Sequence, residues 1–129
     1  YCHPRPAMAV KGKGAGLAGG ILDAKDGEPA VPQDKGAVHS ADIEYAMGTL
    51  PTNRVYDWQP DDYMISDVFS SYYANFVKTG NPNGLGLVNW PAVNGKTVPP
   101  VLQIDVHTFV KTDEAMQQRY LLMDKLFWK

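Results

Sequence analysis

The sequence Gly-Ala-Val-His-Ser-Ala-Asp-Ile-Glu-Tyr-Ala-Met-Gly occupies residues 36–48 and carries most of the information about the fold. Residues 42–47 have the composition of a short helix, and Gly48 follows as a residue that can end a helix in the left-handed conformation. His39 stands between a glycine-rich loop and this helix. A side chain at such a junction is aimed by the scaffold and stays near the surface, where binding and catalytic residues often lie.

A longer amphipathic helix is predicted downstream, opening with Pro60-Asp61-Asp62 and ending before Gly80. Proline and two carboxylates suit a first helical turn, because its N–H groups are free and its dipole favours negative charge. Apolar side chains recur on one face at helical spacing: Ile65, Val68, Phe69, Tyr72, Tyr73, Phe76 and Val77. We expect this face to be buried against other parts of the fold.

The remaining segments supply little sheet to cover that face. Residues 4–36 are rich in glycine and proline and predict a long loop. Residues 101–106 predict one strand, and residues 113–127 predict a last helix with Thr112 as its N-cap. A self-sufficient α/β domain alternates several strands with helices, so we expect this chain to be one part of such a domain.

Composition excludes several classes of protein. Twelve basic and 14 acidic residues among 129 give a net charge of −2, which offers no electrostatic reason to bind nucleic acid or an anionic membrane. The longest weakly polar run, residues 15–22, is far too short to span a bilayer. Cys2 is the single cysteine, which excludes an intrachain disulfide and a zinc site built on cysteine pairs. Secreted and cytoplasmic locations both stay open.

Common catalytic and binding motifs are incomplete in this chain. Residues 14–19 match G-x-G-x-x-G, but the glycines and prolines that follow prevent the helix that a dinucleotide site needs, so no cofactor is expected. The histidines lack metal-ligand spacing, and no metal is expected. No serine lies in a G-x-S-x-G elbow, so no hydrolytic nucleophile is recognised. The residues considered are His3, His39, His107, Ser40, Ser66, Ser70 and Ser71.

Three blocks resemble the type B carboxylesterase family, which includes cholinesterase-like and para-nitrobenzyl esterases. Residues 36–48 are similar to its histidine block, G-x-x-H-x-x-E-[IL]-x-[YF]-x-[FM]-G. Residues 72–83 resemble its Y-W-x-N-F-A-K-T-G-[DN]-P-N block, and Trp90-Pro91 matches the tryptophan-proline that follows. Residues 1–7 and 101–129 are similar to neighbouring strand and helix segments of such esterases, the second range more weakly. Departures from the blocks are Asp42 for glutamate, Tyr73 for tryptophan and Ala46 for valine.

The resemblance implies the C-terminal fragment of an α/β-hydrolase fold, with residues 1–129 as the last segment of a single domain. Within it, residues 1–36 would hold a strand end and the Gly/Pro-rich loop, and residues 37–129 the histidine loop and C-terminal helices. The triad of this fold runs in the order Ser, acid, His. His39 would therefore be the general base, whereas the serine and the acid would lie in the N-terminal part of the same polypeptide.

The implied function is hydrolysis of a small carboxylic ester by a serine mechanism without a cofactor. Ala37, Val38 and Ser40 are candidates to line the acyl pocket. The chain alone is expected to be inactive, and its aromatic helix face is expected to favour self-association. Two alternatives remain: a non-catalytic binding or adhesion protein on the same fold, as neuroligins are, and a complete small interaction module. Retention of His39 favours the enzyme over the first alternative.

Overall fold

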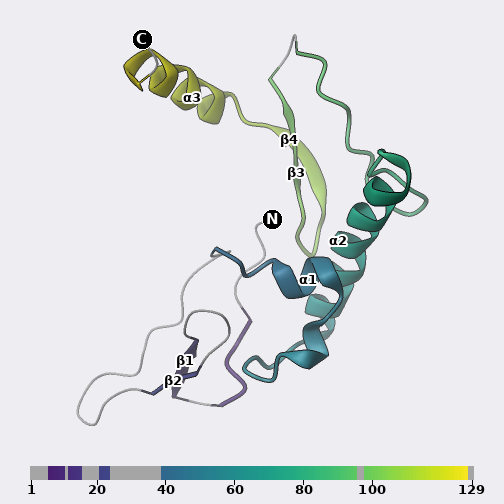
Figure 1. The fold of residues 1–129 in the computed structure, drawn as a ribbon, viewed down its shortest axis with the longest axis vertical. Helices are drawn as coiled ribbons and strands as arrows, with labels where there is room; N and C mark the ends of the chain where they lie inside the picture. The colour runs from purple at the N-terminus through teal and green to yellow at the C-terminus, as the bar shows by residue number, and fades with distance from the viewer. Residues whose placement is uncertain (1–5, 11, 16–20, 24–38, 96–97, 128–129) are drawn as a thin grey trace.

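The computed structural model describes residues 6–10, 12–15, 21–23, 39–95 and 98–127. These residues form short strands and three α-helices in an elongated arrangement (Figure 1). In chain order the elements are β1 (Lys13–Ala15), β2 (Ile21–Asp23), α1 (Ile43–Met47), a 3₁₀ helix (Leu50–Thr52), α2 (Pro60–Thr79), β3 (Pro100–Gln103), β4 (Phe109–Thr112) and α3 (Glu114–Phe127).

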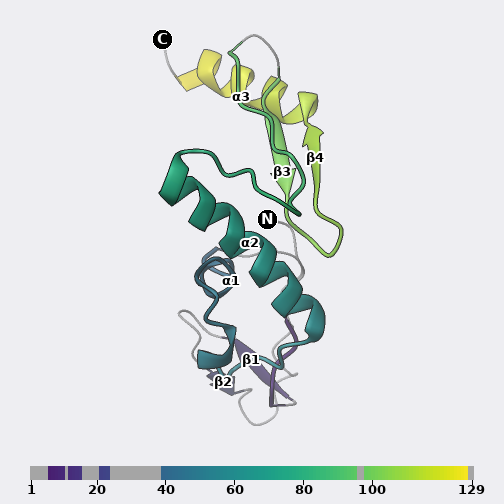
Figure 2. The same cartoon turned by 90° about the vertical axis from the view of Figure 1, so that its right-hand side faces the viewer.

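The core lies between α1, α2 and the β3 strand. Helix α1 packs against the N-terminal half of α2, and the two views of the ribbon agree on this contact (Figure 2). The Tyr45 ring on α1 meets Trp58 edge to face, with ring centroids 5.6 Å apart. The buried hydrophobic side chains of the core are Tyr45, Leu50, Ile65, Phe69, Tyr72, Leu102 and Ile104.

Both predicted helix ends of α2 are confirmed. Pro60 is its first residue, and the Asp62 Oδ2 atom accepts a 2.7 Å hydrogen bond from the backbone N–H of Gln59. That bond satisfies a donor at the helix start, where no intrahelical acceptor exists. Gly80 ends the helix with φ of 75°, a conformation that favours glycine, and its N–H donates to the Phe76 carbonyl at 2.7 Å.

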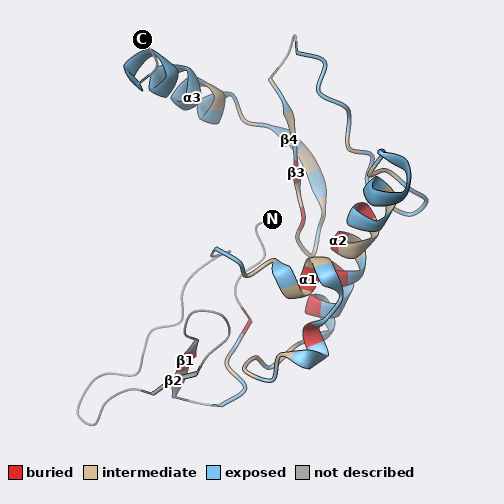
Figure 3. Cartoon of the chain, viewed as in Figure 1, coloured by how far each residue is buried: buried red, intermediate tan, exposed pale blue. Residues whose placement is uncertain are grey.

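The apolar face of α2 is covered over only part of its length. Ile65, Phe69 and Tyr72 are buried, as the periodicity predicts. Farther along, Phe76 is exposed, and Val77 is 82% exposed. Figure 3 shows the C-terminal end of α2 mostly in pale blue, the colour of exposed residues. The described part of this chain therefore covers the first three turns of the face and leaves its C-terminal end open.

The strands form two separate antiparallel pairs among the described residues. In one, Gly14 of β1 pairs with Leu22 of β2, so the prediction of an uninterrupted loop over residues 4–36 is wrong at these strands. Of the rest of that predicted loop, residues 4–5, 11, 16–20 and 24–36 lie outside the described residues. In the other pair, Leu102 of β3 faces Val110 of β4.

The predicted strand over residues 101–106 is too long at its C-terminal end. Strand β3 stops at Gln103, and the chain turns around Asp105, whose carbonyl accepts a 3.1 Å bond from the Thr108 hydroxyl. After this turn the chain runs back antiparallel to β3 as β4, a strand that the sequence pattern does not predict. The last helix begins at Glu114, one residue later than predicted, and its N-cap is Asp113, whose Oδ1 accepts the Met116 N–H at 2.9 Å. Thr112 is instead the last residue of β4.

The loop after α2 is held by the side chain of Asn83. Its Nδ2 donates to the Trp90 carbonyl at 3.0 Å, and its Oδ1 accepts the Trp90 N–H at 2.6 Å. The Trp90 indole donates in turn to the Pro100 carbonyl of β3 at 3.1 Å, and its ring meets Tyr72 edge to face. Asn83 and Trp90, which belong to the second and third sequence blocks, thus fasten the loop between α2 and β3.

Helix α3 extends away from the core at the end of β4 (Figure 1). None of its described side chains is buried, so the predicted stripe of Met116, Tyr120, Met123 and Phe127 is exposed (Figure 3). Among the helices that the structure describes, none combines the length and apolar character needed to cross a bilayer.

Titration of Tyr72 is expected to weaken the fold at high pH. Its hydroxyl donates to the Val88 carbonyl at 2.6 Å, and burial raises the pKa of this phenol above the usual 10.0. Below about pH 10 the folded and unfolded chains both keep the proton; above it the unfolded chain loses the proton first, so stability falls as pH rises. Urea unfolding between about pH 9 and pH 11 should show this slope.

The matched variants for this prediction are Tyr72→Phe and Tyr63→Phe. Tyr72→Phe removes the titrating group and should flatten the slope, whereas Tyr63, an exposed tyrosine on the same helix, should be replaceable without changing it. An equal slope in the wild type and in Tyr72→Phe would contradict the prediction.

Candidate active site

His39 lies at the surface, in the turn that leads into α1. Its side chain is exposed, and its Nδ1 atom is 2.7 Å from the Ser40 Oγ. When Nδ1 carries the proton and donates it to Ser40, Nε2 retains a free lone pair and can accept a proton. The arrangement is therefore compatible with a general base that acts through Nε2.

Ser40 has an unusual backbone conformation. Its φ is 65°, and among the described residues it is the one residue other than glycine with positive φ. A left-handed residue with a Cβ costs roughly 1–2 kcal/mol, and such strain is concentrated at functional sites. The Ser40 carbonyl accepts the Ile43 N–H at 3.4 Å, so the turn that carries His39 runs directly into the first residue of α1.

Helix α1 is in turn fixed by hydrogen bonds from neighbouring elements. The Tyr45 hydroxyl donates to Asp62 Oδ1 at 2.6 Å, and the Ser66 hydroxyl donates to the Tyr45 carbonyl at 2.9 Å. On the outer side, Asn53 Nδ2 donates to Glu44 Oε1 at 2.8 Å. These bonds attach α1 to α2 and to the segment that follows the 3₁₀ helix.

Some of the remaining candidate residues are described by the structure and others are not. Ser40 contacts His39 directly. Ala37 and Val38, the other candidates for the acyl pocket, lie outside the described residues, as does His3. Over the described parts of the chain, no three histidine, cysteine or acidic side chains gather as metal ligands would.

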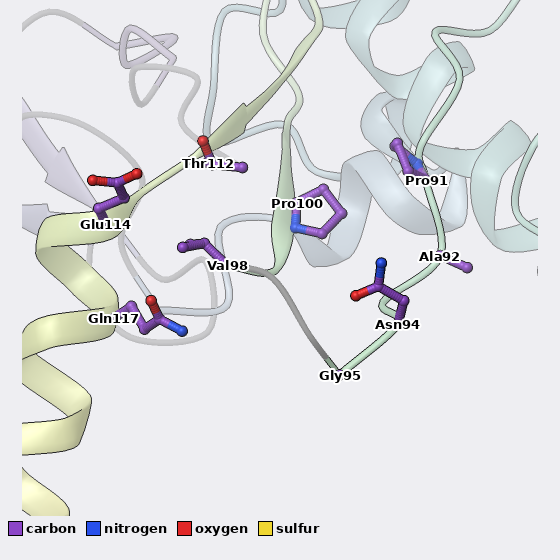
Figure 4. A pocket seen from close by; sticks show the side chains of 9 residues that line it. All are labelled: Pro91, Ala92, Asn94, Gly95, Val98, Pro100, Thr112, Glu114 and Gln117. Carbon is purple, nitrogen blue, oxygen red and sulfur yellow. The ribbon is translucent and has the colours of Figure 1, made fainter.

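Two hollows occur elsewhere on the described surface, and His39 lines neither of them. The larger, about 710 Å³, lies between the loop at residues 91–95, the start of β3 and the first turn of α3. Figure 4 shows Glu114 and Gln117 of α3 on one side of this hollow and Asn94 on the other. It contains no nucleophile paired with a base. The smaller, about 330 Å³, is lined mainly by aliphatic side chains and includes His107.

Comparison with known proteins gives the class to which this arrangement belongs. Residues 22–128 match the carboxylesterase family, a range that includes His39 and every helix of the structure. Because the match covers most of the sequence, the chain belongs to the carboxylesterase family. That family has the α/β-hydrolase fold, and the helices and paired strands described above form a part of it.

Individual relatives match over shorter ranges. The chain is 31% identical over 74 residues to pyrethroid hydrolase Ces2e of Rattus norvegicus, covering 57% of this chain and 13% of that protein. It is 38% identical over 58 residues to the bile salt-activated lipase of Homo sapiens, covering 43% and 7%. It is 32% identical over 63 residues to the acetylcholinesterase of Danio rerio, covering 49% and 10%. The chain thus spans a small part of the length of these relatives.

Proposed function

We propose that this chain is the C-terminal part of a serine carboxylesterase and that His39 is its general base. The observation that carries the proposal is the place of His39. It occupies the histidine position of a block inside the family match, and its exposed ring has Nδ1 2.7 Å from the Ser40 Oγ, so that in the tautomer protonated at Nδ1 the Nε2 lone pair can accept a proton.

In the proposed reaction His39 Nε2 accepts the hydroxyl proton of a serine supplied by another part of the polypeptide. The serine oxygen forms a bond to the ester carbonyl carbon, and the resulting intermediate collapses to an acyl-enzyme. As the C–O bond to the alcohol breaks, His39 returns the proton to the leaving oxygen. His39 then deprotonates a water molecule, whose oxygen bonds to the acyl carbon; the acid leaves as the bond to the serine oxygen breaks and His39 returns the proton to that oxygen.

The triad acid would engage Nδ1 of His39 and orient the ring. In the structure the Ser40 Oγ lies 2.7 Å from that nitrogen. In the complete triad the acid would therefore either share Nδ1 with Ser40 or replace Ser40 as its hydrogen-bond partner. Together with Ala37 and Val38, Ser40 would also border the acyl group of the substrate.

The exposed C-terminal end of the apolar face of α2 supports the proposal that this chain is part of a larger polypeptide. Tyr73, Phe76 and Val77 present exposed apolar surface, which soluble proteins usually cover. In the proposed enzyme the rest of the α/β-hydrolase domain covers these side chains. In the chain alone they would favour self-association.

The test measures hydrolysis of a short-chain aryl ester by the longer polypeptide and by the chain of 129 residues alone. We expect hydrolysis by the longer polypeptide only, together with covalent labelling of that polypeptide alone by a serine-reactive organophosphate. Hydrolysis by the isolated chain would overturn the assignment of the serine to another segment. A folded longer polypeptide without hydrolysis or labelling would overturn the esterase and indicate a non-catalytic binding protein.

A further inference from the structure

Helix α1 cannot hold the His39 turn in place by its own stability. It has five residues and begins four positions after His39, whereas isolated helices shorter than about 12 residues are marginal in water. Its N-cap residue, Asp42, makes no side-chain capping bond. The position of the His39 turn therefore depends on the contacts that hold α1 against α2.

One of these contacts is a buried polar pair. Tyr45 is 0% exposed and Asp62 is 3% exposed, and the 2.6 Å bond from the Tyr45 hydroxyl to Asp62 Oδ1 joins the two helices where they pack (Figure 2). A hydrogen bond to a buried carboxylate is stronger than one between neutral groups, because the charged acceptor is shielded from water.

The two oxygens of Asp62 serve different elements. While Oδ1 accepts from Tyr45, Oδ2 accepts the Gln59 N–H at the start of α2, where the helix dipole also favours negative charge. One carboxylate thus connects Tyr45 of α1, six positions after His39, to the first turn of the 20-residue helix α2. The Ser66 hydroxyl, bonded to the Tyr45 carbonyl, fixes the backbone of α1 from the next turn of α2.

We propose that Tyr45 and Asp62 are positioning residues for His39. This inference rests on the proposed function, because it concerns the alignment of the general base. The histidine block of the family accepts tyrosine or phenylalanine at the position of Tyr45, so the hydroxyl–carboxylate pair is a feature of this chain and not a requirement of the family pattern. Displacement of a catalytic group by about 1 Å can lower a rate about 100-fold.

The chain offers a matched pair of variants, Tyr45→Phe and Tyr72→Phe. Both remove one buried tyrosine hydroxyl that donates at 2.6 Å. Tyr45 lies on α1, six positions after His39, whereas Tyr72 lies on α2 and donates to the Val88 carbonyl of the loop that follows it. In the longer polypeptide, Tyr45→Phe should lower kcat for an aryl ester about 10- to 100-fold with little change in KM. Tyr72→Phe should leave kcat within about twofold at temperatures where both are folded.

A double-mutant comparison separates positioning from folding. In a His39→Ala background the base is absent, so Tyr45→Phe should cause no further loss of the residual rate. A variant that only reduced the folded fraction would lower the residual rate by the same factor as in the wild type. Asp62→Asn, which keeps an acceptor oxygen but loses the charge, should show the same dependence on His39 as Tyr45→Phe.

The outcomes distinguish this inference from the proposed function. If the wild type does not hydrolyse the ester, the proposed function fails and the inference fails with it. If the wild type is active and His39→Ala is not, but Tyr45→Phe behaves like Tyr72→Phe, only the positioning role is overturned. Equal losses from Tyr45→Phe with and without His39 would also overturn it.

Discussion

Replacing His39 with alanine is expected to lower ester turnover by roughly four or more powers of ten. Without the imidazole, the serine proton has no acceptor during attack and the leaving alcohol has no donor during collapse. Only the oxyanion hole and substrate binding would still accelerate the reaction. Because the His39 side chain is exposed, its removal should leave the fold intact, and the circular dichroism spectrum should be unchanged.

The matched control for that prediction is His107→Ala. His107 is also exposed, but it follows β3 and lines the smaller hollow, which His39 does not line. Its replacement should change kcat/KM by less than about twofold. A similar loss in both variants would indicate a general effect of removing surface histidines and would contradict the assignment.

Replacing Ile65 with alanine is expected to cost about 2–5 kcal/mol of unfolding free energy. Ile65 is 1% exposed and is a member of the core cluster that contains Tyr45 and Leu50, so the lost atoms leave a cavity in this core. Surrounding side chains relax only partly into such a cavity, and the lost dispersion contacts add to the lost hydrophobic burial. Urea denaturation of the longer polypeptide should show a lower midpoint with an unchanged slope.

A graded series at Ile65 controls for effects of substitution itself. Ile65→Val removes one methylene group and should cost about 0.5–1.5 kcal/mol. Losses that are equal and small for the valine and alanine variants would show that the contact between α1 and α2 does not stabilise the fold.

The helices could be predicted because their signals are local. Pro60 and the acids that follow it begin α2, and Gly48 and Gly80 end α1 and α2 in the left-handed conformation that glycine favours. The burial of α2 could be predicted only in part. Its periodicity identifies an apolar face but does not show which end of that face has a partner.

The strands were harder to predict because a short segment forms a strand only when it pairs with another segment. Strands β1 and β2 have three residues each, one of them Gly14, and neither sequence shows extended alternation. Strand β4 follows β3 only because the turn at Asp105 returns the chain. Such short segments become strands through the partner that bonds them, and that partner is not visible in a local pattern.

The sequence predicts His39 as the general base, with Ala37, Val38 and Ser40 beside it, because His39 belongs to a recognisable block. These roles stay predictions. The Tyr45–Asp62 pair was missed, because an acid in a first helical turn is already explained by the helix dipole, and the tyrosine lies 17 positions away. The left-handed conformation of Ser40 was also missed, since serine seldom adopts it.

The most direct measurement of the central claim is rescue of His39→Ala by free imidazole. Aryl-ester turnover of the variant and of the wild type would be followed as imidazole is added, with correction for the uncatalysed reaction. If His39 is the proton carrier, imidazole can enter the space left by its ring, and turnover of the variant should rise with imidazole concentration while that of the wild type does not. Equal turnover of the wild type and His39→Ala, unaffected by imidazole in both, would contradict the account.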